Sequence, residues 1–394
     1  MSRPVCSSLV FGFLLLALTC SAQPTSSSRV VDLTAADGIH LKATYFPAAK
    51  SGPGVLLLHQ CNRQRKVWDE LATQMATAGI NVLTLDLRGF GESGGTPIDK
   101  LTPQEAQTEG QKWPSDIDIA FQYLQSQPGI KRDVMGVGGA SCGVNNSVQT
   151  ARRHPKEIKS IVLLSGSTDF TGRQFIRQAG DLPLFAGYAD DDEFKPTIDS
   201  IQWIFSISSN PGKQIVHYAT GGHGADMFRE HPELRDKIMD WYVTTLIKTP
   251  GKAPSATTAW PVPASVEVLN QIDQPGGASR VSQKLAALRK LGPKAVLFSE
   301  AIVNVMGYEH MQAGDIKGGI EIFKLNVEAF PNSPNVYDSL SDAYLADGQK
   351  ELAAQNARKA LELLPNDTTD PEDRRNGIRD SAQQKLKQLG AQQQ

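Results

Sequence analysis

The sequence lacks an excess of charge of either sign, with 40 Lys and Arg residues against 42 Asp and Glu residues. Nucleic acids and anionic membranes attract proteins through a positive field, and neither the whole chain nor any run of basic residues supplies one. We therefore expect no nucleic-acid partner.

The sequence also lacks a hydrophobic run long enough to span a bilayer. The apolar stretch Val10–Leu18 has about half of the roughly 20 residues that a spanning helix needs. A basic residue precedes this stretch and the small residues Cys20–Ala22 follow it, which is typical of a signal peptide. We expect residues 1–22 to be cleaved off near Ala22 and the protein to be exported, to the periplasm or the medium, without a permanent membrane span. Lipid anchoring at Cys20 is the less favoured alternative, because a bulky residue precedes that cysteine.

Cysteine is scarce, and cleavage of the signal peptide would leave only Cys61 and Cys142. Two cysteines cannot form a disulfide scaffold, although an oxidising compartment would permit one bridge between them. A single bridge and two partly buried free thiols both remain open.

Residues 29–248 alternate short apolar runs with helical patterns, which indicates an α/β domain with a mostly parallel sheet and helices on both faces. The central strands are almost continuously apolar, as strands buried on both faces should be. We expect eight strands, at residues 29–33, 40–46, 54–59, 81–86, 134–138, 160–165, 183–187 and 214–218. We expect helices at residues 67–78, 115–127, 143–153, 196–207 and 233–247.

Residues 249–264 contain four prolines and no apolar periodicity, which indicates a linker. Beyond it, Pro331 and Pro365 lie 34 residues apart, as do Gly314 and Gly348. This period predicts an all-α helical-repeat domain over residues 279–390.

The repeats resemble tetratricopeptide repeats, with copies that start at Glu300 and Pro334. Two copies are fewer than the three or so that a stable stack needs, so helices at 282–291 and 373–389, or the first domain, would have to cap them. The family pattern is matched at Gly307, Phe323, Leu340, Tyr344, Ala353, Ala360 and Pro365.

The strand at 134–138 runs into Gly139-Ala140-Ser141-Cys142-Gly143 and then into a helix. A serine at such a strand-to-helix turn sits in a strained, exposed position, and the flanking glycines give it clearance. Ser141 is thereby placed beside a helix N-terminus, whose unpaired N–H groups favour developing negative charge. The motif alone is a weak signal, because a glycine-rich turn that contains a serine is more often bland, but the strand and helix around it strengthen it.

Most of residues 29–248 resemble the α/β-hydrolase superfamily. The resemblance rests on this motif, on the pattern of strands, and on the strand that ends at Leu85-Asp86 and is followed by residues 88–93. Within it, the chain is similar to the dienelactone-hydrolase-like group, whose type members carry Cys where this chain has Ser141. That departure favours ordinary ester hydrolysis over lactone specificity.

A serine nucleophile needs a base to take its proton and a third group to orient that base. His223 follows the last expected strand within Gly221–Gly224, where an α/β hydrolase keeps its histidine. The acid should follow the preceding strand, where three aspartates are adjacent. The family spacing of three residues after a Gly selects Asp190, with Asp191 as the alternative, and the other aspartates then belong to a solvated turn.

The resemblance also implies an oxyanion hole made by the N–H groups of Cys142 and Cys61. Gln60 replaces the Gly that the family commonly has in the loop of Cys61, and we interpret His59 as a structural hydrogen-bonding residue. If both donors are correct, the two mature thiols lie on neighbouring loops, within reach of a bridge.

We therefore expect a serine carboxylic-ester hydrolase that needs neither metal nor organic cofactor and acts on a small-molecule ester in an open site. A serine peptidase for short peptides has the same chemistry and remains open. The alternative of another class is a non-catalytic module that binds a protein or peptide ligand at the helical repeats. Packing against the rest of the chain or between protomers explains the repeats equally well, without a ligand.

Overall fold

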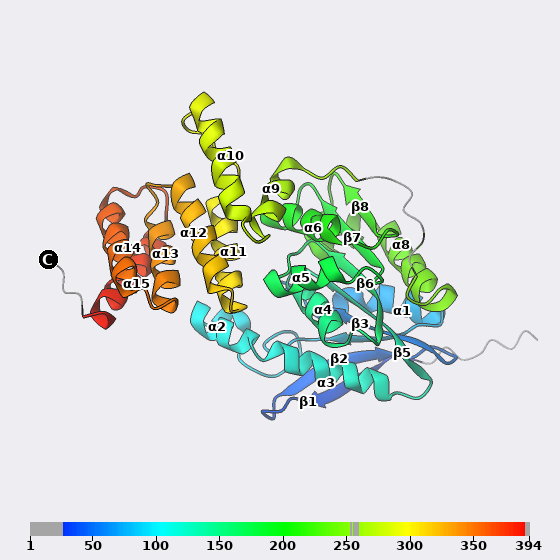
Figure 1. Ribbon diagram of the computed structural model, residues 1–394. Helices are drawn as coiled ribbons and strands as arrows, with labels where there is room; N and C mark the ends of the chain where they lie inside the picture. The colour runs from blue at the N-terminus through cyan, green and yellow to red at the C-terminus, as the bar shows by residue number, and fades with distance from the viewer. Residues whose placement is uncertain (1–26, 253, 255–259, 391–394) are drawn as a thin grey trace, which may run out of the picture.

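The computed structural model describes residues 27–252, 254 and 260–390 (Figure 1). In this part of the chain, an α/β body is followed by an all-α region. The expected signal peptide, residues 1–22, and positions 253 and 255–259 of the expected linker lie outside the described residues. Among the helices of the described ranges, none is long and apolar enough to cross a membrane.

The body contains one eight-stranded, mostly parallel sheet, which confirms the predicted fold class. The strand order is β1-β2-β4-β3-β5-β6-β7-β8, with β2 antiparallel to both of its neighbours and all other pairs parallel. The strands are β1 (Arg29–Thr34), β2 (His40–Phe46), β3 (Gly52–Leu58), β4 (Asn81–Leu85), β5 (Ile130–Ala140), β6 (Ile158–Leu164), β7 (Leu184–Ala189) and β8 (Gln214–Tyr218).

Five helices of the body lie where the apolar periodicity predicts them. They are α1 (Asp69–Thr77), α3 (Trp113–Ser126), α4 (Cys142–Arg153), α6 (Pro196–Ile207) and α8 (Glu233–Tyr242). Sequence reasoning missed α2 (Pro103–Gly110), α5 (Phe170–Gln178) and α7 (Met227–Glu230). In α5 a glycine and several polar residues interrupt the apolar pattern, and the helix is fixed instead by its cap, in which Asp169 accepts a 2.9 Å hydrogen bond from the N–H of Gly172.

The sheet separates two apolar cores, because successive side chains of a strand point to opposite faces. Leu56 and Leu58 of β3 belong to the core that also contains Phe121 of α3. Val55 and Leu57 belong to the core on the other face, beneath α1 and α8. Burial on both faces explains why the central strands have almost no polar residues.

The all-α region begins at Ala264, earlier than the expected residue 279. Its helices are α9 (Ala264–Ile272), α10 (Gly277–Leu291), α11 (Glu300–Gln312), α12 (Ile316–Ala329), α13 (Pro334–Ala346), α14 (Lys350–Leu363) and α15 (Glu372–Gln388). The two helix pairs start at Glu300 and Pro334. In the first pair α11 and α12 approach closely, because the ring of Phe323 lies where a side chain at Gly307 would be.

A buried ion-pair cluster anchors this region to the body. Arg173 on α5 lies 2.7 Å from the carboxylate of Asp273, directly after α9, and 2.7 Å from that of Glu309 on α11. Arg173 is 2% exposed and Asp273 is fully buried. Removing one member of such a pair leaves a buried charge without a partner, at a cost of roughly 3–5 kcal/mol. Figure 1 shows the result, with α9 and α11 beside the body and α13 to α15 farther out.

Candidate active site

Ser141 occupies a strained turn between β5 and α4. Its φ of 53° and ψ of −119° lie in a region that non-glycine residues rarely adopt. The turn is tight on both sides: a side chain at Gly139 would collide with the carbonyl of Gly143, and one at Gly143 would collide with the carbonyl of Leu58. Both glycines are therefore required, and Ser141 is presented at the carboxyl edge of the sheet as the sequence predicts.

His223 pairs with Asp192 in the interior of the protein. The Nδ1 atom of His223 lies 2.9 and 3.0 Å from the two carboxylate oxygens of Asp192. The side chains are 2% and 0% exposed. Burial raises the pKa of Asp192, but the hydrogen bonds from His223 and from the N–H of Phe194 outweigh it, so that this pKa lies below its ordinary value. The charged carboxylate thus holds the imidazole in one orientation.

Asp190, which the sequence analysis selects as the acid, is not the partner of His223, and this prediction is wrong in that respect. The Asp190 carboxylate lies 2.7 Å from Nε2 of His217. The physical reason is that β7 continues past Gly187: the N–H of Asp190 still bonds to the carbonyl of Tyr218, 2.9 Å away, which keeps Asp190 in register with β8. The chain turns only afterwards, and the turn delivers Asp192.

Asp191, the alternative acid, does not reach His223 either. Its carboxylate accepts hydrogen bonds from the backbone N–H groups of Gly221 (3.2 Å) and Gly222 (2.8 Å). Asp191 therefore fixes the glycine loop that leads to His223. Nothing in the run of three aspartates distinguishes these roles, because each depends on where β7 ends.

The loop of His223 meets the turn of Ser141. A Cβ atom placed on Gly224 would lie 3.2 Å from the Cβ of Ala140, so the residues next to His223 and Ser141 are in contact. The loop of His223 and the turn of Ser141 therefore pack against each other, and Asp192 reaches His223 from the turn that follows β7.

Gln60 ties a third loop to this site. Its fully buried side chain accepts a 2.7 Å hydrogen bond from the N–H of Ala225 and donates one of 3.2 Å to the carbonyl of His223. From the sequence, Gln60 is recognised only as a replacement of the glycine that the family commonly has there. In the structure its amide fills the space beside Gly224, where a side chain would collide with it.

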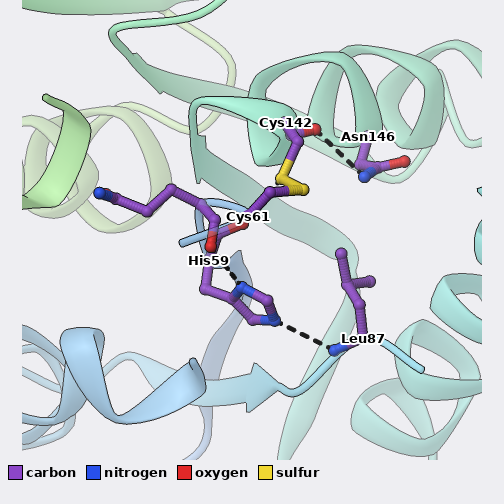
Figure 2. The surroundings of a disulfide bond; sticks show 6 residues. His59, Cys61, Leu87, Cys142 and Asn146 are labelled. Atoms are coloured by element: carbon purple, nitrogen blue, oxygen red, sulfur yellow. Dashed lines mark hydrogen bonds between the residues drawn. A yellow bond between two sulfur atoms is a disulfide. The ribbon is translucent and has the colours of Figure 1, made fainter. Parts of the chain in front are cut away.

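Cys61 and Cys142 are joined by a disulfide bond, which decides between the two alternatives left open by the sequence (Figure 2). Their Cα atoms lie 5.8 Å apart. Cys142 is the first residue of α4, so its N–H has no partner within the helix. In the described ranges the N–H of Cys61 also makes no hydrogen bond to the protein. Two free N–H groups thus lie at the two ends of the bridge, one on the loop after β3 and one at the start of α4.

His59 holds the loop of Cys61 from below, as Figure 2 shows. Its Nε2 accepts a 3.1 Å hydrogen bond from the N–H of Leu87, and its Nδ1 lies 2.8 Å from the carbonyl of Gln60. Accepting at Nε2 leaves the proton on Nδ1. Burial lowers the pKa of His59, which favours a neutral imidazole at this structural position.

Residues 50–182 match the family model described as "Serine aminopeptidase, S33". A thiohydrolase from Aspergillus aculeatus is 30% identical over 229 residues, which cover 55% of this chain and 67% of that protein.

Two solved structures resemble the body. An α/β hydrolase from Penicillium sp. sh18 is 16% identical, with a TM-score of 0.44, and the alignment covers 56% of this chain and 99% of that chain. A dienelactone hydrolase from Anabaena variabilis has the same identity, TM-score and coverage. With 30% identity to the thiohydrolase over two thirds of that protein's length, the chain belongs to the α/β-hydrolase family.

Proposed function

We propose that this protein is a serine hydrolase that cleaves carboxylic esters through an acyl-Ser141 intermediate. The observation that carries the proposal is the buried pair of His223 and Asp192, presented on a loop that touches the turn of Ser141. A serine hydroxyl is a poor nucleophile near neutral pH, and such a pair supplies both the base and the group that keeps the base in its productive tautomer.

In the proposed reaction, the Ser141 oxygen attacks the carbonyl carbon of the ester while Nε2 of His223 takes the hydroxyl proton. The negative charge that forms on the carbonyl oxygen is stabilised by the N–H groups of Cys142 and Cys61. The tetrahedral intermediate then expels the alcohol, which receives the proton from His223. A water molecule attacks the acyl-serine by the same route in reverse and releases the carboxylic acid.

A thioester is a second substrate class for this site, and the similarity to a thiohydrolase supports it. The same intermediate forms, and the leaving group is then a thiolate instead of an alkoxide. Comparing an oxygen ester with the thioester of the same acid would measure the preference, because only the leaving group differs.

A peptidase and a non-catalytic module are the alternatives. Hydrolysis of short-chain nitrophenyl esters, thioesters and aminoacyl nitroanilides by the whole protein would separate them. We expect Ser141→Ala to lower ester hydrolysis about 10⁴-fold or more. Ser165→Ala is a matched control, because Ser165 is the other described non-glycine residue with a positive φ, at the end of the neighbouring strand. Equal rates for wild type and Ser141→Ala would overturn the proposal.

We also propose that the protein is exported after cleavage near Ala22. The Cys61–Cys142 bridge supports this, because disulfides persist in oxidising compartments and are rare where thiols are kept reduced. The N-terminal residue and mass of the protein recovered from its native host would test it. A mature chain that retains residues 1–22 would contradict cleavage.

A further inference from the structure

A cavity of about 240 Å³ lies between the α/β body and the all-α region. Ser167 and Thr168, which follow β6, line its side nearest the sheet. The remaining walls are mainly apolar and come mostly from α6 and α11, with Arg173 of α5. The apolar residues are Pro196, Trp203 and Ile204 of α6, and Ala301, Ile302, Val305 and Met306 of α11.

Two residues of the cavity wall directly follow Gly166, which packs against the turn of Ser141. Gly166 lies against Ser141, since a Cβ atom at Gly166 would be 2.5 Å from the Ser141 carbonyl oxygen. Ser167 and Thr168 continue directly from this contact into the cavity wall. The hydroxyl of Thr168 also donates a 2.8 Å hydrogen bond to Asn145, one turn along α4 from Ser141.

A second link to the candidate site runs through Phe194, which contacts His223. Phe194 packs its ring 4.7 Å from the ring of His223, measured between centroids, and remains 50% exposed. Two residues later, Pro196 begins α6 and lines the cavity. An exposed aromatic ring beside His223 thus lies two residues along the chain from the cavity wall.

The charged groups that line the cavity are already paired. Arg173 is bound by Asp273 and Glu309 and lies 4.4 Å from the ring centroid of Trp203. Burial raises the pKa of Glu309, which further disfavours a free negative charge there. A cavity with apolar walls and paired charges suits an uncharged, apolar group better than an ion.

We propose that this cavity binds the acyl chain of the substrate, and that α11 of the all-α region thereby sets the chain length that the enzyme accepts. The inference rests on the proposed hydrolase function and adds the substrate class to it. The cavity is smaller than the roughly 300–1,000 Å³ pockets that enclose drug-sized ligands, so it fits a short, unbranched acyl chain.

The test measures kcat/KM of the full-length protein for nitrophenyl acetate and nitrophenyl hexanoate. Val305 is 56% exposed and lines the cavity, so a Trp at this position would fill it without entering the core. We expect Val305→Trp to lower the hexanoate-to-acetate ratio of kcat/KM by about tenfold or more. Val296→Trp is the matched control, because Val296 is 50% exposed and does not line the cavity, and we expect its ratio to equal that of wild type.

A second variant shifts the preference in the opposite direction and guards against misfolding of the first. Val305→Ala widens the cavity and should raise the ratio of octanoate to hexanoate. An unchanged ratio in both Val305 variants, with ester hydrolysis intact, overturns the acyl site alone. If the wild-type protein hydrolyses none of these esters and Ser141 takes up no fluorophosphonate label, the proposed function is overturned and this inference with it.

Discussion

The disulfide between Cys61 and Cys142 connects the loop after β3 to the first residue of α4, and so joins the two residues whose N–H groups we assign to the oxyanion hole. The positions of these donors relative to each other are fixed covalently. Donors in fixed positions need no reorganisation when charge develops on the substrate, which is why preorganised sites stabilise it strongly.

Breaking this bond should therefore lower both turnover and stability. We expect the double variant Cys61→Ser, Cys142→Ser to lose roughly 2–5 kcal/mol in free energy of unfolding. Its kcat should fall by up to about 10²-fold, the lower end of the cost of losing one oxyanion donor. Steady-state kinetics and denaturant unfolding would measure the two effects.

The control for this prediction is chemical reduction. A thiol reductant should slow the wild-type enzyme and leave the double variant unaffected, because only the former has a bond to break. Two titratable thiols in the native, exported protein would contradict the bond itself.

The identity of the acid is tested by a pair of matched substitutions. Asp192→Asn keeps the shape of the side chain but disturbs the tautomer of His223, and we expect kcat to fall by about 10⁴-fold. Asp190→Asn disturbs only the contact with His217 and should leave kcat near that of wild type. The assignment of Asp192 would fail if the two variants exchanged these effects.

The sequence predicts the eight strands because each central strand is an apolar run, and predicts Ser141 because its motif has both a strand and a helix around it. The acid escapes prediction for a different reason. Whether Asp190 or Asp192 faces His223 depends on two further residues of β7 pairing with β8, a register that local composition does not encode. Asp191 is likewise placed by contacts with a loop 30 residues away.

The early start of the all-α region has a similar explanation. α9 follows a proline-rich stretch, and its apolar face packs in one cluster with Trp203 of α6 and with residues of α10 to α12, so a partner in the body helps to cover it. Trp203 of α6 belongs to the apolar cluster of this region, so α6 packs both on the sheet and on the all-α region. The apolar periodicity of α6 does not reveal this second contact.

Gln60 is predicted to be a positioning residue. Gln60→Gly restores the residue common in the family but removes the acceptor of the buried Ala225 N–H, which should cost about 1–3 kcal/mol of stability. Because the loop of His223 loses its buried tie to the loop of Cys61 and keeps only the more exposed ion pair of Arg63 with Asp226, we expect kcat to fall while KM changes little. Asn62→Gly, at an exposed position two residues away, is the control. Equal kinetics for both variants would show that the tie has no role in turnover.

The final prediction concerns the acid stability of the fold and Glu92, which lies in the family-like segment 88–93 between β4 and α2. Hydrogen bonds from Lys66 and Arg65 lower the pKa of Glu92 from 4.5 to about 2. A carboxyl group whose pKa is lower in the folded state stabilises the fold above its unfolded pKa, and this contribution disappears as the pH falls through the folded value. The Tm of wild type should therefore exceed that of Glu92→Gln at neutral pH, and the difference should shrink between pH 4.5 and about 2.

Thermal melts of both proteins across this range would measure the difference in Tm. Glu70→Gln is the control, because Glu70 also pairs with an arginine, Arg235, but from an exposed position. High salt should reduce the Glu92 effect only in part, since Lys66 is exposed and screened whereas the side chain of Arg65 is fully buried. A difference that stayed constant down to pH 2 would mean that the carboxylate of Glu92 does not stabilise the fold through its charge.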